Sequence, residues 1–233
     1  MIKHFLKQIL QNSSGILSLK YYFRWKASLE DGANSIRDEQ PWITFKTISF
    51  LKNNLNKNSH VFEYGGGGST LFFVKLVGEV VTVEHNKEWF AILSEMINKK
   101  AFSNWKGNFI DAEKGDLISN PNKNNPSHYS SGDKPSVGFN YKKYVSCIDH
   151  FSDESFDLVS VDGRSRPSCI LHAIPKIKNG GFLLVDNSDR DYYLSFFQER
   201  LKREFVNVVD GFGPTPYAKE FTRTSIWQKK IRL

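Results

Sequence analysis

Cysteine is scarce in this chain of 233 residues, in which only Cys147 and Cys169 occur. The two do not form a C-x-x-C pair or another ligand-like spacing, so a disulfide framework and a cysteine zinc site are both disfavoured. Long apolar runs are also missing, because no stretch approaches the roughly 20 apolar residues that cross a bilayer. Polar residues interrupt the first ten positions, which argues against a signal peptide. We expect a soluble cytoplasmic protein without a transmembrane segment, and peripheral membrane contact through residues 1–26 is the lesser alternative.

Blocks of like charge are absent as well. The formal net charge is +7, but the lysines and arginines are scattered in short groups, so an acidic partner is permitted rather than required. Nucleic acid is therefore not the favoured partner. A hydrophobic content of 39% is enough for a core, and this length suits one domain of the α/β class.

Glycine is concentrated at one place in the sequence. An apolar, strand-like segment at 61–64 is followed by four glycines and then by Ser69 and Thr70. Backbone without a Cβ can approach a ligand closely, and the free N–H groups of a first helical turn face polar or anionic groups. A second strand-like segment ends in Glu84, about 20 residues further on, where a nucleotide-binding unit places its ribose-binding carboxylate. Together these features predict a nucleotide site.

The glycine spacing does not fit the dinucleotide fingerprint G-x-G-x-x-G. Counted from Gly65 the sixth place is Thr70, and counted from Gly66 it is Leu71. The last two predicted strands are also joined by 211–216 without a helix, whereas a dinucleotide-binding half would supply one. A nicotinamide-dependent oxidoreductase is therefore disfavoured.

What remains is the pattern Glu63-x-Gly65-x-Gly67, an acid just before a glycine turn. It resembles the first motif of class I S-adenosyl-L-methionine (SAM) dependent methyltransferases. The resemblance continues through Glu84, through residues 156–163 and through residues 179–187, in the order of the family. It covers roughly residues 41–230 and implies SAM as the cofactor.

The chain alternates predicted strands with predicted helices, which indicates a parallel sheet with crossover helices on both faces. The last two strands should pair antiparallel, because no helix joins them. The resemblance implies a Rossmann-like three-layer sandwich with a seven-stranded, mostly parallel sheet in the order 3-2-1-4-5-7-6. The predicted strands are 61–64, 80–84, 108–111, 156–161, 181–186, 205–210 and 223–229, and the predicted helices are 69–77, 87–100, 167–177 and 190–203.

Two segments stand outside this alternation. Residues 1–40 are predicted to be an N-terminal helical appendage to a methyltransferase domain at 41–233, in which apolar spacing predicts a first helix at 42–51. Residues 113–148 have little periodicity. A loop of this length inside a compact domain is typically functional or disordered, so we interpret it as a lid or substrate loop, or else as a mobile insertion.

The resemblance also implies roles for individual residues. Glu63 would hold the amino group of SAM, directly or through water, and Glu84 would accept both ribose hydroxyls with its two oxygens. Ser69 and Thr70 would donate to the carboxylate of SAM or cap the helix. The predicted cofactor-binding residues are Glu63, Gly65, Gly66, Gly67, Ser69, Thr70, Glu84, His85, Asp111 and Asp162.

Asp162, Asp186 and Asn187 follow two neighbouring strands, so their oxygens could converge on Mg²⁺ or another divalent cation. This resembles the metal-dependent catechol-type O-methyltransferases, although the lysine that those enzymes carry three residues after the first aspartate is Ser165 here. A metal would lower the pKa of a substrate hydroxyl. Without a metal, the two aspartates would bind loops or substrate.

Arg164 and Arg166 carry planar guanidinium groups that suit a carboxylate or phosphate, so an anionic or sugar-like acceptor is one interpretation. The other is that they pair with Asp189 or Asp191. The predicted catalytic residues are Asp162, Arg164 and Asp186, and His128 and His150 are further candidates for a general base.

The favoured function is methyl transfer from SAM to a small-molecule or glycan-type acceptor, on oxygen rather than nitrogen. A nucleic-acid methyltransferase is one alternative, and it is disfavoured by the absence of an Asn/Asp-Pro-Pro-Tyr/Phe motif after the fourth strand. A non-catalytic SAM-binding or nucleotide-binding module is the other.

Overall fold

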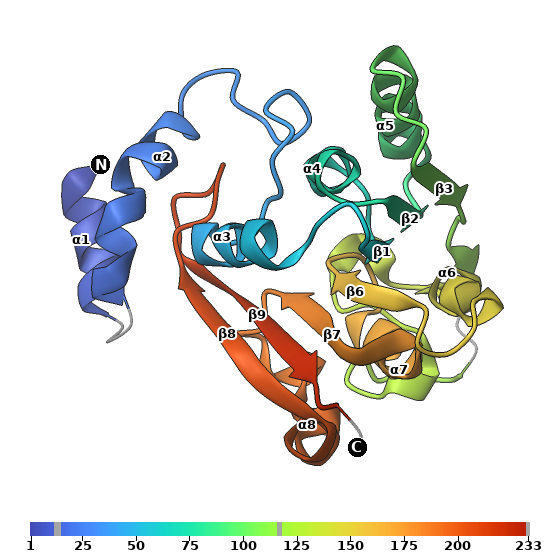
Figure 1. Ribbon diagram of the computed structural model, residues 1–233. Coiled ribbons are helices and arrows are strands. Elements are labelled where there is room, and N and C mark those ends of the chain that lie inside the picture. Colours follow the sequence, from blue (N-terminus) through green and yellow to red (C-terminus); the bar gives the residue numbers. More distant parts are fainter. Residues whose placement is uncertain (12–14, 116–117, 232–233) are drawn as a thin grey trace.

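The computed structural model describes residues 1–11, 15–115 and 118–231 (Figure 1). The strands of its main sheet are β1 (His60–Tyr64), β2 (Glu79–Glu84), β3 (Trp105–Phe109), β6 (Phe156–Val161), β7 (Ile177–Asp186), β8 (Phe205–Gly213) and β9 (Thr222–Lys229). The α-helices are α1 (Ile2–Leu10), α2 (Tyr22–Ala27), α3 (Phe45–Asn54), α4 (Gly68–Leu76), α5 (Lys87–Lys99), α6 (Lys142–Ser146), α7 (Arg166–Lys176) and α8 (Gln198–Glu204). Two short strands, β4 (Glu113–Lys114) and β5 (Phe139–Asn140), and six 3₁₀ turns complete it: η1 (Gly15–Tyr21), η2 (Pro126–His128), η3 (Lys134–Ser136), η4 (Cys147–His150), η5 (Asp191–Tyr193) and η6 (Ser195–Phe197).

The seven-stranded sheet has the order β3-β2-β1-β6-β7-β9-β8. Strands β3, β2, β1, β6 and β7 run parallel, and β9 pairs antiparallel with both β7 and β8. Renumbered within this sheet, the order is 3-2-1-4-5-7-6, so the predicted topology and the C-terminal antiparallel hairpin are confirmed.

Alternation along the strands produces two cores, one on each face of the sheet. Val61 belongs to the core beneath α3, α4 and α5, while its neighbour Phe62 belongs to the core beneath α6, α7 and α8. Leu158 and Val159 on β6 divide in the same way. Figure 1 shows these helices as layers above and below the sheet, so the predicted three-layer sandwich is confirmed.

Several predicted elements differ in their bounds, including β7, which begins at Ile177 rather than at residue 181, and β8, which ends at Gly213 rather than at residue 210. Three further differences concern β3, the first domain helix and the helix predicted at 190–203. β3 ends at Phe109 rather than at residue 111. The first domain helix begins at Phe45, because Thr44 N–H donates to Thr224 Oγ1 and Phe45 N–H donates to the carbonyl of Pro214, which ties the preceding chain to the hairpin. The helix predicted at 190–203 is broken into η5, η6 and α8, and Arg190 donates to the hydroxyl of Tyr193 in the first of these turns.

The segment 113–148 is more ordered than the structureless loop that its sequence predicts. β4 and β5 pair antiparallel within it, and its C-terminal part contains α6. Tyr144, Val145 and Ile148 are fully buried in the core under α7. Residues 116–117 lie outside the described residues. The second half of the segment is therefore part of the domain core.

The N-terminal helices pack on the loop that joins β8 to β9. Trp25 is fully buried and its Nε1 donates to the carbonyl oxygen of Ala218 at 2.7 Å. The rings of Phe5 and Phe221 lie 5.0 Å apart. The next segment reaches α4, where Ser35 and Gln40 lie against Gly68. Among residues 1–11, 15–115 and 118–231, no helix is long and apolar enough to span a membrane.

Gly68 is the position at which this packing tolerates no side chain. A Cβ there would fall inside van der Waals contact of the backbone carbonyl oxygens of Ser35 and Gln40. We expect Gly68→Ala to lower the free energy of unfolding by about 1–3 kcal/mol, as overpacking against backbone does. Urea unfolding would measure it, with Glu95→Ala on the exposed side of α5 as the control. Equal stability of the two variants would contradict the packing argument.

Candidate functional site

A cavity of about 240 Å³ opens where β1, β2 and β6 end and α4 begins. Ligands of open α/β sheets bind at this edge, beyond the carboxyl ends of the strands. The wall combines the glycine turn, the acid at the end of β2 and the segment after β6. It is formed by Ser35, Trp42, Gly65, Gly66, Gly67, Gly68, Ser69, Glu84, His85, Trp89, Asp162, Gly163, Arg164 and Arg166.

Glu63 anchors the glycine turn from below. Its side chain points to the α4 face of β1, where Thr70 Oγ1 donates to Glu63 Oε2 at 2.5 Å and Thr82 Oγ1 donates to the same oxygen at 3.1 Å. Thr70 Oγ1 in turn accepts the N–H of Gly67 at 3.0 Å. The carboxylate thus orients the first turn of α4 through one hydroxyl.

Burial alters the proton affinity of Glu63, which is 1% exposed. Desolvation raises its pKa to about 7, against the opposing effect of the hydroxyls of Ser69, Thr70 and Thr82. Glu63 Oε1 is buried and has no hydrogen-bond partner in the described structure. A buried acceptor without a donor is costly, so this oxygen is suited to a donor supplied by a ligand.

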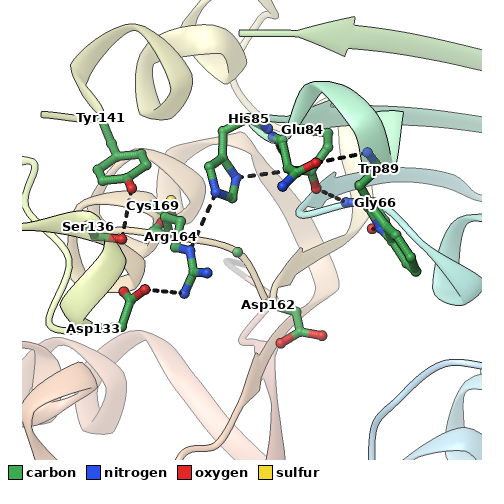
Figure 2. A network of polar contacts seen from close by, with 12 residues as sticks. Gly66, Glu84, His85, Trp89, Asp133, Ser136, Tyr141, Asp162, Arg164 and Cys169 are labelled. Carbon is green, nitrogen blue, oxygen red and sulfur yellow. Dashed lines mark hydrogen bonds and ion pairs between the residues drawn. The ribbon is translucent and has the colours of Figure 1, made fainter. Parts of the chain in front are cut away.

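Glu84 holds the turn from the side. Its Oε2 accepts the N–H of Gly66 at 3.0 Å, and its Oε1 accepts the N–H groups of His85 and Asn86 at 2.7 Å each (Figure 2). Burial raises the pKa of Glu84, but the His85 side chain and the backbone N–H groups of Asn86 and Gly66 outweigh it and hold the pKa below its usual value. Because Oε1 already accepts two N–H groups, Oε2 is the oxygen with capacity left for a ligand hydroxyl.

A polar chain leads from Glu84 to the segment 113–148. His85 Nδ1 lies 3.0 Å from Glu84 Oε1, and Arg164 Nε lies 3.4 Å from His85 Nε2. Arg164 Nη1 then pairs with Asp133 Oδ2 at 2.8 Å (Figure 2). Burial raises the pKa of Asp133, and Ser131 and Arg164 bring it below the usual range. The ion pair therefore joins the predicted lid segment to the wall of the cavity.

Arg166 joins the ends of β6 and β7. Its Nη2 donates to Asp162 Oδ1 at 2.8 Å, and its Nη1 lies 3.9 Å from Asp186 Oδ2 and donates to the Asp186 carbonyl. Thr224 Oγ1 donates to Asp186 Oδ1 at 2.5 Å. Desolvation and the neighbouring Asp186 raise the pKa of Asp162, while Arg166 opposes the rise. The alternative pairing of Arg164 and Arg166 with Asp189 or Asp191 is wrong.

The aspartates do not form a convincing metal centre. Arg166 already places a cation beside both carboxylates, and a divalent cation there would meet a like charge. Within the described residues there is no group of three or more His, Cys, Asp or Glu side chains that could hold a metal ion. Asn187, the third predicted ligand, is a residue type outside that group, and it lines a cavity together with Asp162 and Asp186. The prediction of Mg²⁺ or another divalent cation gains no support.

A second cavity of about 330 Å³ adjoins the first. The two share Trp42 and Asp162, and the Asp162 side chain is 29% exposed. In Figure 2 the Asp162 side chain points away from Glu84 and His85. The second wall is completed by Asp186, Asn187, Ala218 and Thr222.

Three of the predicted cofactor residues are not part of the first wall. Glu63 and Thr70 lie beneath the turn, and Asp111 is exposed because β3 ends two residues before it. His128 and His150 line neither cavity. The residues in the wall that sequence reasoning missed include Ser35, Trp42 and Trp89.

Trp89 and Trp42 are missed for different reasons. Trp89 Nε1 donates to the carbonyl oxygen of Gly66, and its position in the first turn of α5 could have suggested such a contact. Trp42 is 54% exposed and its ring lies edge-on to Tyr217 at 6.1 Å. No local pattern in the sequence indicates the contact between Trp42 and Tyr217.

No protein-family model matches the chain, and no curated protein matches it in sequence. Solved structures match its fold. An rRNA methylase from Streptococcus thermophilus has 15% identity and a TM-score of 0.53, covering 79% of this chain and 95% of its own. A methyltransferase-like protein from Silicibacter pomeroyi has 20% identity and a TM-score of 0.52, covering 80% and 86%. An O-methyltransferase from Bacillus cereus, in complex with SAH, has 16% identity and a TM-score of 0.52, covering 97% and 90%.

These likenesses establish the class I methyltransferase fold, as the resemblance in sequence predicts. At this level of identity they establish the fold alone. The chemistry of the site has to be argued from its residues.

Because Glu63 has a raised pKa, its ionisation should destabilise the fold. In the unfolded chain it ionises near 4.5 and in the folded chain at about 7, so stability should fall as pH rises through this window. The wild type should lose on the order of 2–3 kcal/mol relative to Glu63→Gln across it. Urea unfolding of both proteins across the window measures the difference. Parallel profiles would contradict the assignment.

Proposed function

We propose that the chain is a SAM-dependent methyltransferase. The observation that carries the proposal is the cavity at the glycine turn, which Glu84, Asp162 and the N-terminus of α4 line together, in a fold shared with an SAH-bound protein. The glycines alone would not carry it, because side chains at Gly65 and Gly66 would collide with Gly163 and with Thr82 and Leu93. Packing alone therefore requires glycine at both positions, whether or not a ligand binds.

Two observations support SAM as the ligand of these residues. Glu63 Oε1 is buried beneath the turn without a partner, and a water molecule that links it to a cationic amino group in the cavity would supply the missing donor. Glu84 Oε2 retains capacity for one ribose hydroxyl, which is one fewer than the sequence predicts. When bound, SAM supplies a methyl group that its sulfonium centre already activates.

The remaining work of the protein is to place an acceptor and take its proton. Holding two reactants at contact distance supplies most of the acceleration in such a transfer. Asp162 borders both cavities, and burial together with the neighbouring Asp186 raises its pKa, so its carboxylate is more basic than that of a solvent-exposed aspartate. Arg166 fixes its orientation through Oδ1. We assign Asp162 the role of base toward an acceptor hydroxyl in the second cavity.

The proposed acceptor is a small polar molecule or a sugar, methylated on oxygen. The second cavity is small, at about 330 Å³, and Trp42 gives it an aromatic face on which a sugar or planar ring can stack. Asn187 and Thr222 add polar lining.

A nucleic acid is the second candidate acceptor. The net charge of +7 and the likeness to an rRNA methylase favour it. Binding to RNA would fall steeply with salt, because each neutralised phosphate releases a counterion, whereas binding of a small neutral acceptor would change little.

Cofactor binding can be tested apart from turnover. We expect Glu84→Ala to weaken binding of S-adenosylhomocysteine at least tenfold in isothermal titration calorimetry, since hydrogen bonds to a charged group contribute about 1.5–3 kcal/mol. Glu88→Ala, in the first turn of α5 and outside the cavity wall, is the matched control. If wild type and the Glu84 variant bind equally, Glu84 does not belong to the site.

Turnover tests the enzyme itself. Transfer of labelled methyl from SAM should be detected with an acceptor among sugars, sugar acids, phenols and RNA. Asp162→Asn should lower kcat about a hundredfold to ten-thousandfold and abolish the fall in rate toward acid pH, because the base has been removed. Affinity for S-adenosylhomocysteine should hold within a few fold. An Asn variant as active as the wild type would remove Asp162 from catalysis, and binding without turnover on any acceptor would indicate a non-catalytic module.

A further inference from the structure

The outer side of α1 carries an apolar stripe that no part of the described chain covers. Ile2, Leu6 and Leu10 are spaced four residues apart and are 55%, 41% and 84% exposed. At 100° per residue they lie about 80° around the helix from Phe5 and Ile9, which face the core. The helix therefore presents two apolar stripes, and only one of them is used by the fold.

Lysine borders the exposed stripe. Lys3 and Lys7 project about 80° further around α1, on the side away from the core. Around the helix, a buried apolar stripe is therefore followed by an exposed apolar stripe and then by a basic stripe. A helix that lies in a membrane interface has this arrangement, with an apolar face bordered by cations.

The following turns continue the exposed apolar residues. Ile16, Leu17 and Leu19 of η1 are 64%, 74% and 49% exposed, and Phe23 of α2 is 79% exposed. Lys20, Arg24 and Lys26 are exposed beside them. We use the name N-terminal surface for Ile2, Lys3, Leu6, Lys7, Leu10, Ile16, Leu17, Leu19, Lys20, Phe23, Arg24 and Lys26.

A packed interior holds this surface in place. Phe5 and Trp25 are completely buried, and their rings lie 4.9 Å apart. Tyr22 packs edge-on against Phe5 at 5.1 Å. The exposed apolar side chains thus belong to an ordered unit, which lies on the opposite side of the molecule from α5 and β3 (Figure 1).

Net positive charge is concentrated in this part of the chain because it contains no acidic residue. Residues 1–29 contain five of the 32 lysines and arginines and none of the 25 aspartates and glutamates, so they carry +5 of the net +7. Each lysine or arginine near an anionic lipid surface adds attraction that is lost within a Debye length.

The positive charge and the exposed apolar side chains of the N-terminal surface together distinguish between three kinds of partner: a second copy of the chain, a nucleic acid and a lipid bilayer. A second copy of this chain would bring +5 against +5 across a two-fold interface, and like charges across an interface are repelled. Nucleic acid would satisfy the cations but leave seven exposed apolar side chains without a role. We propose that the N-terminal surface docks the protein on an anionic lipid bilayer. This inference does not depend on methyl transfer.

Vesicle sedimentation of the full chain tests the proposal. The protein should pellet with phosphatidylcholine vesicles containing about 30% phosphatidylglycerol, bind vesicles of phosphatidylcholine alone at least tenfold more weakly, and lose binding as salt rises above about 0.15 M. Replacing three lysines of the N-terminal surface with glutamine should weaken binding to the anionic vesicles about a hundredfold. The variant is Lys3→Gln/Lys7→Gln/Lys20→Gln, and its matched control, with equal loss of charge on other exposed lysines, is Lys52→Gln/Lys99→Gln/Lys114→Gln.

The apolar contribution has its own pair of variants. Replacing Leu10, Leu17 and Phe23 with serine should weaken binding to the anionic vesicles at least tenfold, because less apolar surface is then inserted into the bilayer. These residues are not in the core, and thermal unfolding should confirm that the variant folds. The control replaces three residues of similar exposure elsewhere, Val137→Ser/Phe196→Ser/Val206→Ser.

Three outcomes would overturn the proposal. One is that no protein pellets with the anionic vesicles. Another is equal binding to neutral and anionic vesicles, which would remove the role of charge. The third is a dimer by light scattering that the Leu10, Leu17 and Phe23 substitutions dissociate, since the surface would then belong to a second copy.

Discussion

The glycine turn depends on two buried carboxylates, which hold it from below and from the side. Glu63 reaches Gly67 through the hydroxyl of Thr70, and Glu84 accepts the N–H of Gly66 directly. Backbone N–H groups at a turn have no regular partner, so side-chain acceptors decide where they point. The two acids therefore set the shape of the cavity wall, and the free lone pairs that remain on each are the ones that a ligand can use.

The two cavities meet at the end of β6 because one arginine joins neighbouring strand ends. Arg166 is the first residue of α7, yet it contacts Asp162 behind it and the end of β7 beside it. Its charge is balanced within the protein, which is why it stabilises the position of Asp162 instead of attracting an anion. Arg164 differs, because its partner Asp133 belongs to the insertion and both side chains remain partly exposed. The exposed ion pair is the weaker of the two connections.

Sequence alone predicted the sheet and most of the glycine-turn site. Val61 and Phe62 alternate between the faces, so strand period and strand order followed from local pattern and family resemblance. The helix predicted at 190–203 is instead two 3₁₀ turns followed by α8, and no periodic pattern in the sequence marks these breaks. Trp42 could not be placed in the site either, since tertiary packing against Tyr217 brings it there. The partners of Arg166 were not predicted, although Asp162 lies only four residues before it. Its contact with Asp186 depends on the pairing of β6 with β7, which brings the two strand ends together.

The hydrogen bond from Trp25 to Ala218 joins residues 193 positions apart, and this has a consequence for biosynthesis. The ribosome makes chain at roughly 5–20 residues per second, so Trp25 waits about 10–40 seconds for its partner to be made. During that interval Phe5 and Trp25 have no hairpin loop to cover them. The nascent chain therefore presents an unfinished aromatic cluster for most of its translation, and this is the kind of segment that chaperones bind.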